Sequence, residues 1–242
     1  MNSILLDQLA PRGVLRAAIN LSNPLLVTGR DATGDPAGIA PDLAREIAQR
    51  LGVACELVSF NAPHEIADSA EADSWDIGLI GADPVRAQQI AFTAGYVEIE
   101  AGYLVAKDTE LTDVSAVDRS GVRLAVAAGT AYDLWLTRQI EHATLIRFHT
   151  HADAREAFVE QRLEVLAGLK AQLLADTPTL AGSRVLDGRF VAVEQAVGLR
   201  RIHREGHAFL SAYIEEAKSG GLIKRLIERH NGLGLRVASA AV

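Results

Sequence analysis

Cysteine is almost absent from the chain: one residue in 242, which excludes an internal disulfide. Cys55 follows Val53 and Ala54 and precedes Leu57, an apolar setting that favours a buried structural thiol over a reactive one. Because a fold without disulfides works in the cytosol and in the periplasm, cysteine content leaves the redox compartment open.

Long apolar segments are also missing. No run approaches the roughly 18 apolar residues of a membrane span, so we expect no membrane insertion. The first residues, MNSILLDQLAPRGVLR, have no basic segment before their short apolar run, residues 4–6. As it stands the sequence predicts a cytoplasmic protein, and a periplasmic one if a leader was removed.

Basic clusters are absent as well, and the net charge is −7. This balance argues against a nucleic-acid partner. The sequence has no GxSxG, HExxH or P-loop motif. His149 and His151 have no evident third ligand, which favours a solvated loop pair over a metal site. We therefore expect no metal and no cofactor.

The chain does contain alternating strand and helix patterns in both halves. In the first half, apolar residues between 41 and 51 follow one helical face. The other expected elements are strands at 14–19, 54–60, 75–81, 122–127, 144–148 and 163–167, short extended segments at 96–99 and 103–105, and helices at 63–70, 132–140, 153–161 and 207–229, the last broken at Gly220-Gly221. This order predicts an α/β fold with mostly parallel sheets covered by helices.

The segment WDIGLIGADPVRAQQIAFTAGY, residues 75–96, carries the strongest functional signal. A buried strand is followed by Asp83 and Pro84, which favour the N-cap and first position of a helix. Arg86 would then lie in the first helical turn, beside N–H groups without helical acceptors. A guanidinium in that place suits a carboxylate or another small anion, although an ordinary surface arginine is the alternative.

Five motifs in order make the chain similar to the type 2 periplasmic solute-binding proteins of family 3, which serve polar amino-acid ABC importers. They are GIAPDLAREIAQRLGV (38–53), WDIGLIGADPVRAQQIAFTAGYV (75–97), GVRLAVAAGTAYD (121–133), QAVGLRR (195–201) and SGGLIKRLIERHNG (219–232). Each motif is weak by itself, and their order and spacing over nearly the whole chain carry the resemblance.

The resemblance implies a two-lobed, periplasmic-binding-protein-like type II fold: two αβ lobes with mixed sheets, joined by two hinge strands. Lobe 1 would comprise residues 1–106 and 197–242, and lobe 2 residues 107–196, with hinge crossings near 104–106 and 193–197. A ligand in the cleft between the lobes would favour the closed form by its differential affinity. The implied partners are a small carboxylate-bearing solute and an ABC permease, and we expect a monomer.

The resemblance also implies the site residues. Arg86 would pair with the ligand carboxylate, and Asp83, which replaces the usual threonine, could cap the turn, contact the ligand or do both. Phe60 could cover the ligand or belong to the core. The remaining positions implied by the resemblance are Gly81 and Ala82 at the strand end, Asn20, Ser22 and Asn23 in the first loop, and Gly129, Thr130 and Ala131 as anion contacts from lobe 2.

The sequence departs from the family in two places. Ser22 replaces an aromatic residue, and Gly168 or Leu169 replaces the aspartate that pairs with the ligand ammonium. An ammonium group without a counter-charge loses hydration for little return. The sequence therefore favours a small carboxylate or another anion with apolar character over an α-amino acid, unless Asp83, Glu98 or Glu194 supplies the missing charge.

Two other functions stay open. Some members of this fold are cyclohexadienyl dehydratases with a glutamate as proton donor, but Gln172 stands near that position here. Glu164, the nearest carboxylate, is expected at a strand start and exposed. A stand-alone ligand sensor is the second alternative, although the sequence shows no helix-turn-helix and no membrane anchor. A binding protein rather than an enzyme is the main expectation.

Overall fold

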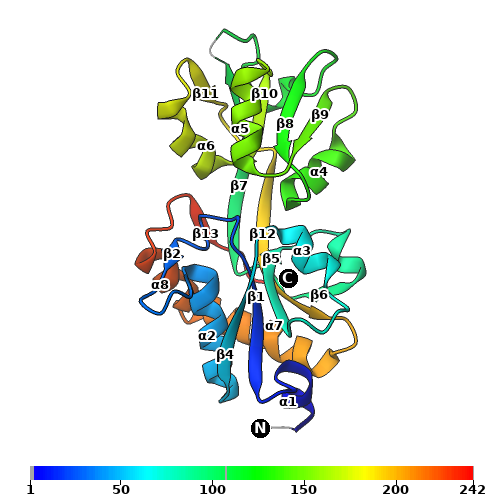
Figure 1. Cartoon of the computed structure of the whole chain (residues 1–242), viewed down its shortest axis with the longest axis vertical. Helices are drawn as coiled ribbons and strands as arrows, with labels where there is room; N and C mark the ends of the chain where they lie inside the picture. Colours follow the sequence, from blue (N-terminus) through cyan, green and yellow to red (C-terminus); the bar gives the residue numbers. More distant parts are fainter. Residues whose placement is uncertain (1–2, 107, 242) are drawn as a thin grey trace. The chain divides into compact units, whose positions relative to one another are not determined.

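The computed structural model describes residues 3–106 and 108–241, which form two compact units (Figure 1). Unit 1 comprises Met1–Glu98 and Glu194–Val242, and unit 2 comprises Ile99–Val193. The chain passes from one unit to the other within strands β7 (Val97–Ala106) and β12 (Val191–Arg200). The boundaries expected from the sequence, 106/107 and 196/197, lie eight residues later, at the end of β7, and three residues later, within β12.

The sheet of unit 1 is built around β1 (Val14–Asn20), which pairs in parallel with β4 (Ala54–Phe60) and β5 (Ile77–Gly81). β12 runs antiparallel to β5, β6 (Ile90–Phe92) pairs with β12, and β13 (Leu235–Val237) pairs with β7. Because β1, β4 and β5 are parallel, their carboxyl ends lie at one edge of the sheet.

Helices cover this sheet, and their boundaries follow local sequence signals. The apolar face predicted for α2 (Ile39–Leu51) is buried, and Gly52 ends the helix in the left-handed conformation, with φ 69°. The predicted break in the tail is confirmed, because Gly220 and Gly221 separate two helices. The other unit 1 elements are α1 (Ser3–Leu9), the hairpin β2 (Gly29–Arg30) and β3 (Pro36–Ala37), α3 (Pro63–Asp68), α7 (Arg204–Ser219) and α8 (Leu222–Arg229).

Unit 2 also consists of a sheet with parallel strands and helices that cover it. β8 (Arg123–Ala127) pairs in parallel with β9 (Thr144–Phe148) and β10 (Val165–Leu169), and β10 runs antiparallel to β7. Leu104, Leu166 and Leu173 are fully buried in the main core cluster of this unit. The remaining elements are α4 (Ala131–Gln139), α5 (His151–Glu160), α6 (Lys170–Asp176), β11 (Ser183–Val185), which pairs with β7, and the short 3-10 helices η2 (Val114–Ala116) and η3 (Thr177–Thr179).

The helix predicted after Asp83 and Pro84 is wrong. Residues 84–85 form a turn, and only the short 3-10 helix η1 (Arg86–Gln88) follows. The reason is tertiary: β6 begins at Ile90 and pairs with β12, so residues 82–89 are too few for a turn and an α-helix. The extended segments predicted at 96–99 and 103–105 are parts of the single strand β7.

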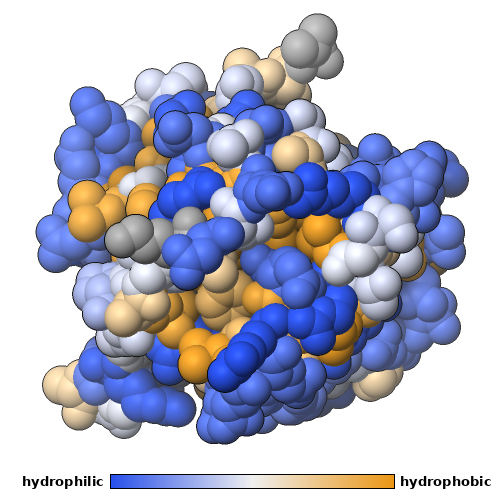
Figure 2. Space-filling model, turned by 90° about the horizontal axis from the view of Figure 1, so that it is seen from above, coloured by the Kyte–Doolittle hydropathy of each residue, from blue (hydrophilic) through white to orange (hydrophobic). Residues whose placement is uncertain are grey.

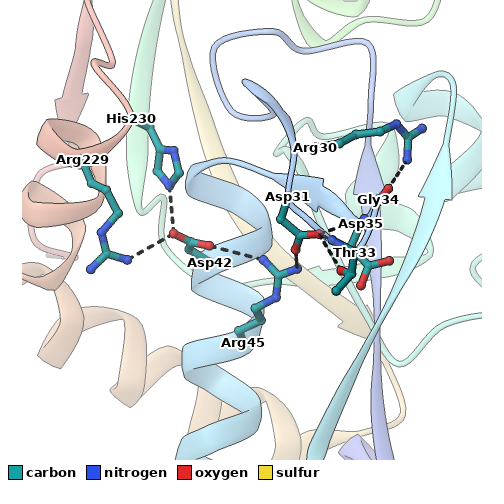
Figure 3. Close-up of polar contacts among 9 residues, drawn as sticks. All are labelled: Arg30, Asp31, Thr33, Gly34, Asp35, Asp42, Arg45, Arg229 and His230. Atoms are coloured by element: carbon teal, nitrogen blue, oxygen red, sulfur yellow. Dashed lines mark hydrogen bonds and ion pairs between the residues drawn. The ribbon is translucent and has the colours of Figure 1, made fainter.

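A charged network joins α2 to α8 and to the β2–β3 hairpin in unit 1 (Figure 3). Asp42 of α2 accepts hydrogen bonds from His230 Nε2 at 2.8 Å and Arg229 Nη1 at 3.2 Å. Arg45 connects Asp42 to Asp31 of the hairpin, with its Nη2 2.9 Å from Asp31 Oδ2. These contacts hold the segment after β1 against the helix that follows it.

On the face shown in Figure 2, hydrophilic residues make up much of the surface, and apolar residues are exposed between them. The large exposed apolar residues are distributed over both units and include Val85, Val159, Leu174, Ile202 and Leu233. Within the described residues, no helix combines the length and the apolar composition that a bilayer crossing needs.

Candidate ligand-binding site

Residues from three strands meet at the carboxyl edge of the unit 1 sheet. Asn20 ends β1 and stands opposite Phe60, which ends β4, and Gly81 ends β5 on the other side of β1. In open α/β sheets, ligands bind outside the carboxyl ends of the strands. Three of the positions implied by the resemblance therefore lie on the edge where a ligand site is expected.

Among the site residues implied by the resemblance, Arg86 has the most unusual surroundings. Its side chain is 5% exposed, and its Nη1 donates a hydrogen bond to the carbonyl of Gly81 at 2.6 Å. Burial lowers the pKa of the guanidinium to about 10, against the opposing effect of the Asp83 and Asp68 carboxylates. Arg86 is still a cation at neutral pH, and a cation that has lost its hydration gains strongly from an anionic partner.

Asp83 caps the turn that presents Arg86. Its Oδ1 accepts a hydrogen bond from Val85 N at 2.8 Å, and its carbonyl accepts one from Ala87 N at 2.9 Å. The capping role is confirmed, but it serves a turn instead of an α-helix. The backbone N–H groups expected to be available around Arg86 are therefore partly used, because Val85 and Ala87 both donate to Asp83.

The backbone of Gly81 and Ala82 belongs to the sheet edge. Gly81 accepts the hydrogen bond from Arg86, and Ala82 N donates to the carbonyl of Glu194 on β12 at 2.8 Å. Glu194 itself is exposed. These contacts place Ala82 beside the main chain of Glu194 within unit 1, and a ligand contact by Arg86, Ala82 or Glu194 stays a prediction.

The three polar residues of the first loop hold its shape. Asn20 Oδ1 accepts from Ser22 N at 3.1 Å and from Ser22 Oγ at 2.8 Å. Asn23 is 7% exposed, and its Oδ1 accepts from Leu25 N at 3.1 Å. The loop that follows β1 is thus organised by its own side chains at the carboxyl edge.

Phe60 packs against the core, and a ligand contact by its ring stays a prediction. It ends β4 at the carboxyl edge, and its half-buried ring packs against a core cluster that includes Ile66, Trp75 and Ile80. Because the residue is only half-buried, the core interpretation does not exclude the ligand-covering one.

In unit 2, the Gly129-Thr130-Ala131 turn follows β8 and begins α4. Thr130 Oγ1 accepts a hydrogen bond from Asp133 N at 3.2 Å and donates one to the carbonyl of Ala127 at 3.0 Å. Gly129 has φ 68°, and its N–H donates to Asp133 Oδ2 at 2.9 Å. One of the N–H groups implied as an anion contact is therefore already bound, while Ala131 opens the helix, where N–H groups lack intrahelical acceptors.

Sequence reasoning missed Asp133 and Arg147 as the residues that hold this turn. Asp133 is 3% exposed, and its Oδ1 accepts from Arg147 Nε at 2.9 Å. The spacing Thr130-x-x-Asp133 is a capping-box pattern and could have pointed to Asp133. Nothing in the local sequence identifies Arg147, because it comes from the neighbouring strand β9.

The position of the missing family aspartate is apolar and closed. Leu169 is 6% exposed, and a Cβ added at Gly168 would lie 2.9 Å from His151 Cε1. The prediction of a solvated His149–His151 pair is wrong for His151, whose Nε2 lies 2.8 Å from Asp176 Oδ2. Among the described residues, no group of three or more His, Cys, Asp or Glu side chains could hold a metal ion.

Glu164 is not the exposed carboxylate that the sequence predicted. It is half-buried and accepts hydrogen bonds from Arg123 N and Nε, both at 2.9 Å. The Arg123 guanidinium lowers the pKa of this carboxyl group, so Glu164 is not poised to donate a proton. Arg123 could not be identified as its partner from the sequence, because it lies on the adjacent strand.

A cavity of about 700 Å³ opens in unit 2 at the start of β10, opposite to the end of the sheet that carries the Gly129-Thr130-Ala131 turn. It is lined by the end of α5, the start of β10 and the segment before β11, with Phe158, Leu163 and Leu180 among its apolar residues. None of the site residues implied by the resemblance lines this cavity.

A family profile described as "Bacterial extracellular solute-binding proteins, family 3" matches residues 15–233. The chain belongs to this family. The histidine-binding periplasmic protein of Salmonella typhimurium is 23% identical over 213 residues, which cover 83% of this chain and 81% of that protein. Members of the family are the solute-binding components of ABC importers.

Solved structures support the fold. An ancestral amino acid-binding protein, AncCDT-1, described as a precursor of cyclohexadienyl dehydratase, gives a TM-score of 0.74 at 23% identity, covering 93% of this chain and 98% of that one. An ABC-transporter binding component from Wolinella succinogenes complexed with lysine gives 0.76 at 19% identity, covering 90% and 95%. The fold is that of the two-lobed type II periplasmic binding proteins.

Proposed function

We propose that this solute-binding protein captures a small carboxylate-bearing solute, amino-acid-like or an organic acid, and delivers it to an ABC permease. The observation that carries the proposal is the buried Arg86 guanidinium at the carboxyl edge of unit 1, where its Nη1 is fixed by the Gly81 carbonyl. Two of the similar proteins named above are a histidine-binding protein and a binding component complexed with lysine, and both of these amino acids carry a carboxylate.

Arg86 would bind the solute carboxylate, and the turn at Thr130 and Ala131 would supply N–H donors to the same solute from unit 2. The turn is suited to this because Asp133 and Arg147 hold it from behind. Phe60 would cover the solute, while Asn20, Ser22 and Asn23 would shape the loop beside it. Binding by residues of both units would favour the closed form, with β7 and β12 as hinges.

We propose a binding protein and not an enzyme. Gln172 stands near the position where the resemblance places the acid of the dehydratases, and Glu164 is held by Arg123. We further propose that the protein acts in the periplasm, as the named histidine-binding relative does, and as a monomer. Fractionation of cells that express the native gene tests the compartment.

The central test is a ligand screen with the purified protein, freed of bound solute by unfolding and refolding. Isothermal titration against amino acids and simple carboxylates should identify a tight ligand for the unmodified protein. Arg86→Gln should weaken its binding by about 30-fold or more, because removal of one partner from a desolvated charge pair costs about 2–5 kcal/mol.

Arg12→Gln is the matched control. Arg12 is an exposed arginine of unit 1 that pairs with Asp73, away from the carboxyl edge. Its replacement should leave the affinity unchanged. Equal affinities for Arg86→Gln and the unmodified protein would contradict the proposal.

A further inference from the structure

The β10 cavity, the space of about 700 Å³ at the start of β10, reaches the core of unit 2. Phe158, Leu163 and Leu180 line it, and all three are buried members of the main core cluster of this unit. Binding sites for small molecules have volumes of about 300–1,000 Å³ and mainly apolar walls. In size and in lining, the β10 cavity therefore resembles a ligand site.

Apolar surface continues from the buried lining to the rim of the cavity. Val159, in the last turn of α5, also lines the cavity and is 55% exposed. A single exposed valine is ordinary, but this one lies next to buried core residues that border an open space. An apolar molecule in the cavity would remove both kinds of surface from water, which is favourable.

Backbone hydrogen bonds at the end of α5 fix this part of the lining. Leu163 N donates to the Phe158 carbonyl at 3.0 Å, and Arg162 N donates to the Val159 carbonyl at 3.3 Å. Together with the left-handed backbone of Arg162, these two bonds form a Schellman motif. The motif sets the positions of Phe158 and Leu163, so the apolar lining is formed before a ligand binds.

Arg162 occupies a backbone position that suits glycine better. Its φ is 49°, and glycine is the usual residue at this position of a Schellman motif because it has no Cβ to strain the left-handed backbone. Strained residues of this kind concentrate at functional sites. Arg162 lines the β10 cavity, and the strain is therefore located at its border.

The hydroxyl groups of the lining are used within the protein. Thr179 Oγ1 donates a hydrogen bond to the Asp176 carbonyl at 2.8 Å, and Ser183 Oγ donates one to the Leu180 carbonyl at 2.7 Å. A ligand that needs these hydroxyls as donors would have to displace existing bonds. This favours a ligand with few polar groups.

The charged residues of the lining balance each other. Glu164 is paired with Arg123, whose Nη2 lies 2.8 Å from its Oε1. Arg162 and Asp108 are both exposed, line the cavity and have opposite signs. An ion that moves into an apolar space loses hydration and needs an uncompensated counter-charge in return. The charge balance of the described lining therefore favours an uncharged ligand.

We propose that the β10 cavity is a second ligand site and binds an uncharged, mainly apolar small molecule. The proposal goes beyond the proposed function and does not rest on it, because none of the residues implied in solute binding lines this cavity. A molecule bound there would add apolar contacts to the core of unit 2.

The test uses three probes with the same carbon chain and different head groups: 1-octanol, octanoate and octylamine. Each is titrated into the ¹⁵N-labelled protein at neutral pH, at concentrations at which it forms no micelles. We expect saturable binding of 1-octanol, about threefold or more tighter than binding of either charged probe, because a charged head group loses hydration without a counter-charge. The amide signals of Val159, Arg162 and Gly182, which line the cavity, should shift most.

Variants at two equally exposed apolar residues locate the site. Val159→Asp should weaken binding of 1-octanol about fivefold or more, because a charge replaces apolar surface at the rim. Val159→Gln, which adds no charge, should weaken it less. Leu174→Asp is the matched control, because Leu174 is also 55% exposed and belongs to unit 2 but does not line the cavity. Thermal unfolding of each variant checks that the fold is retained.

Several outcomes would overturn this inference: no saturable binding of 1-octanol, tighter binding of octanoate or octylamine, largest shifts outside the cavity lining, or equal losses for Val159→Asp and Leu174→Asp. Arg86→Gln separates the inference from the proposed function. This variant should bind 1-octanol like the unmodified protein even though it loses the solute, and a parallel loss of 1-octanol would mean that the probe binds at the solute site.

Discussion

At the residue scale, Arg16 and Arg86 are both buried among the described residues, and their surroundings differ. Arg16 is 4% exposed and makes hydrogen bonds to both oxygens of Asp76, at 2.7 and 3.2 Å, so its charge is compensated within the fold. Arg86 is equally buried, but burial lowers its pKa in spite of the nearby carboxylates. The sequence predicted Arg86 as an anion-binding residue because it follows the end of a strand. It could not have shown the ion pair of Arg16 with Asp76, because the two residues are distant in sequence.

Replacement of Asp133 by asparagine should weaken the turn that carries Thr130. Asparagine has no charge, so the variant loses the carboxylate that accepts hydrogen bonds from Arg147 and Gly129 N. The loss of such an acceptor from a buried network costs about 1–3 kcal/mol of folding free energy. Urea unfolding should show a decrease of that size, and ligand affinity should fall with it. Asp187→Asn, at an exposed position of the same unit, is the control. An unchanged midpoint for Asp133→Asn would contradict the role given to this carboxylate.

Cys55 should be a slow nucleophile. Burial raises the pKa of its thiol to about 11, so almost none of it is thiolate at pH 8. We expect its reaction with a disulfide reagent at pH 8 to be at least about tenfold slower in the folded protein than in urea. A rate in the folded protein equal to that of the unfolded chain would exclude a protected thiol.

At the element scale, local signals succeeded where the segment contains its own start and stop. The helix α2 was predicted from its apolar face and from Gly52, and both are confirmed. The helix expected at Asp83 failed because pairing of β6 with β12 overrides the local preference. The strand β7 was divided in the prediction because its middle, around Gly102, has no strand signal, whereas pairing with Gly168 keeps it extended.

Gly52→Ala should destabilise unit 1 by about 1 kcal/mol. The residue has φ 69°, and a Cβ there would meet no atom within 4 Å, so backbone strain alone sets the cost. Gly29→Ala is a suitable comparison, because that glycine also has open space around it and no positive φ. Chemical denaturation of the two variants should show a loss for Gly52→Ala only, and similar losses would point to another cause.

At the scale of the whole molecule, ligand binding should stabilise the fold by mass action. At a free concentration of 100 times Kd, the free energy of unfolding rises by about 2.7 kcal/mol if only the native state binds. Calorimetric melting with the ligand found by titration should show the corresponding increase in Tm. Arg86→Gln should show little rise at the same concentration, and an equal rise would mean that the ligand binds elsewhere.

The organisation of the whole chain was easier to predict than the site. Five ordered motifs pointed to the family and its fold, and the family profile matches the stretch of chain that holds them. The site depends on contacts between strands. The contact of Arg147 with Asp133 below the Thr130 turn and the hydrogen bond from Ala82 N to the Glu194 carbonyl could therefore be recognised only once the register of the sheets was known.

The division of unit 1 into two stretches of sequence bears on biosynthesis. On the ribosome, β1, β4 and β5 emerge early, but β12, α7 and α8 are the last large elements to be made. Unit 2 is continuous in sequence and is complete on the ribosome while unit 1 still lacks two strands, β12 and β13, and two helices. Until these elements are made, apolar surfaces of the unit 1 strands stay uncovered, and a chaperone would be most useful during this interval.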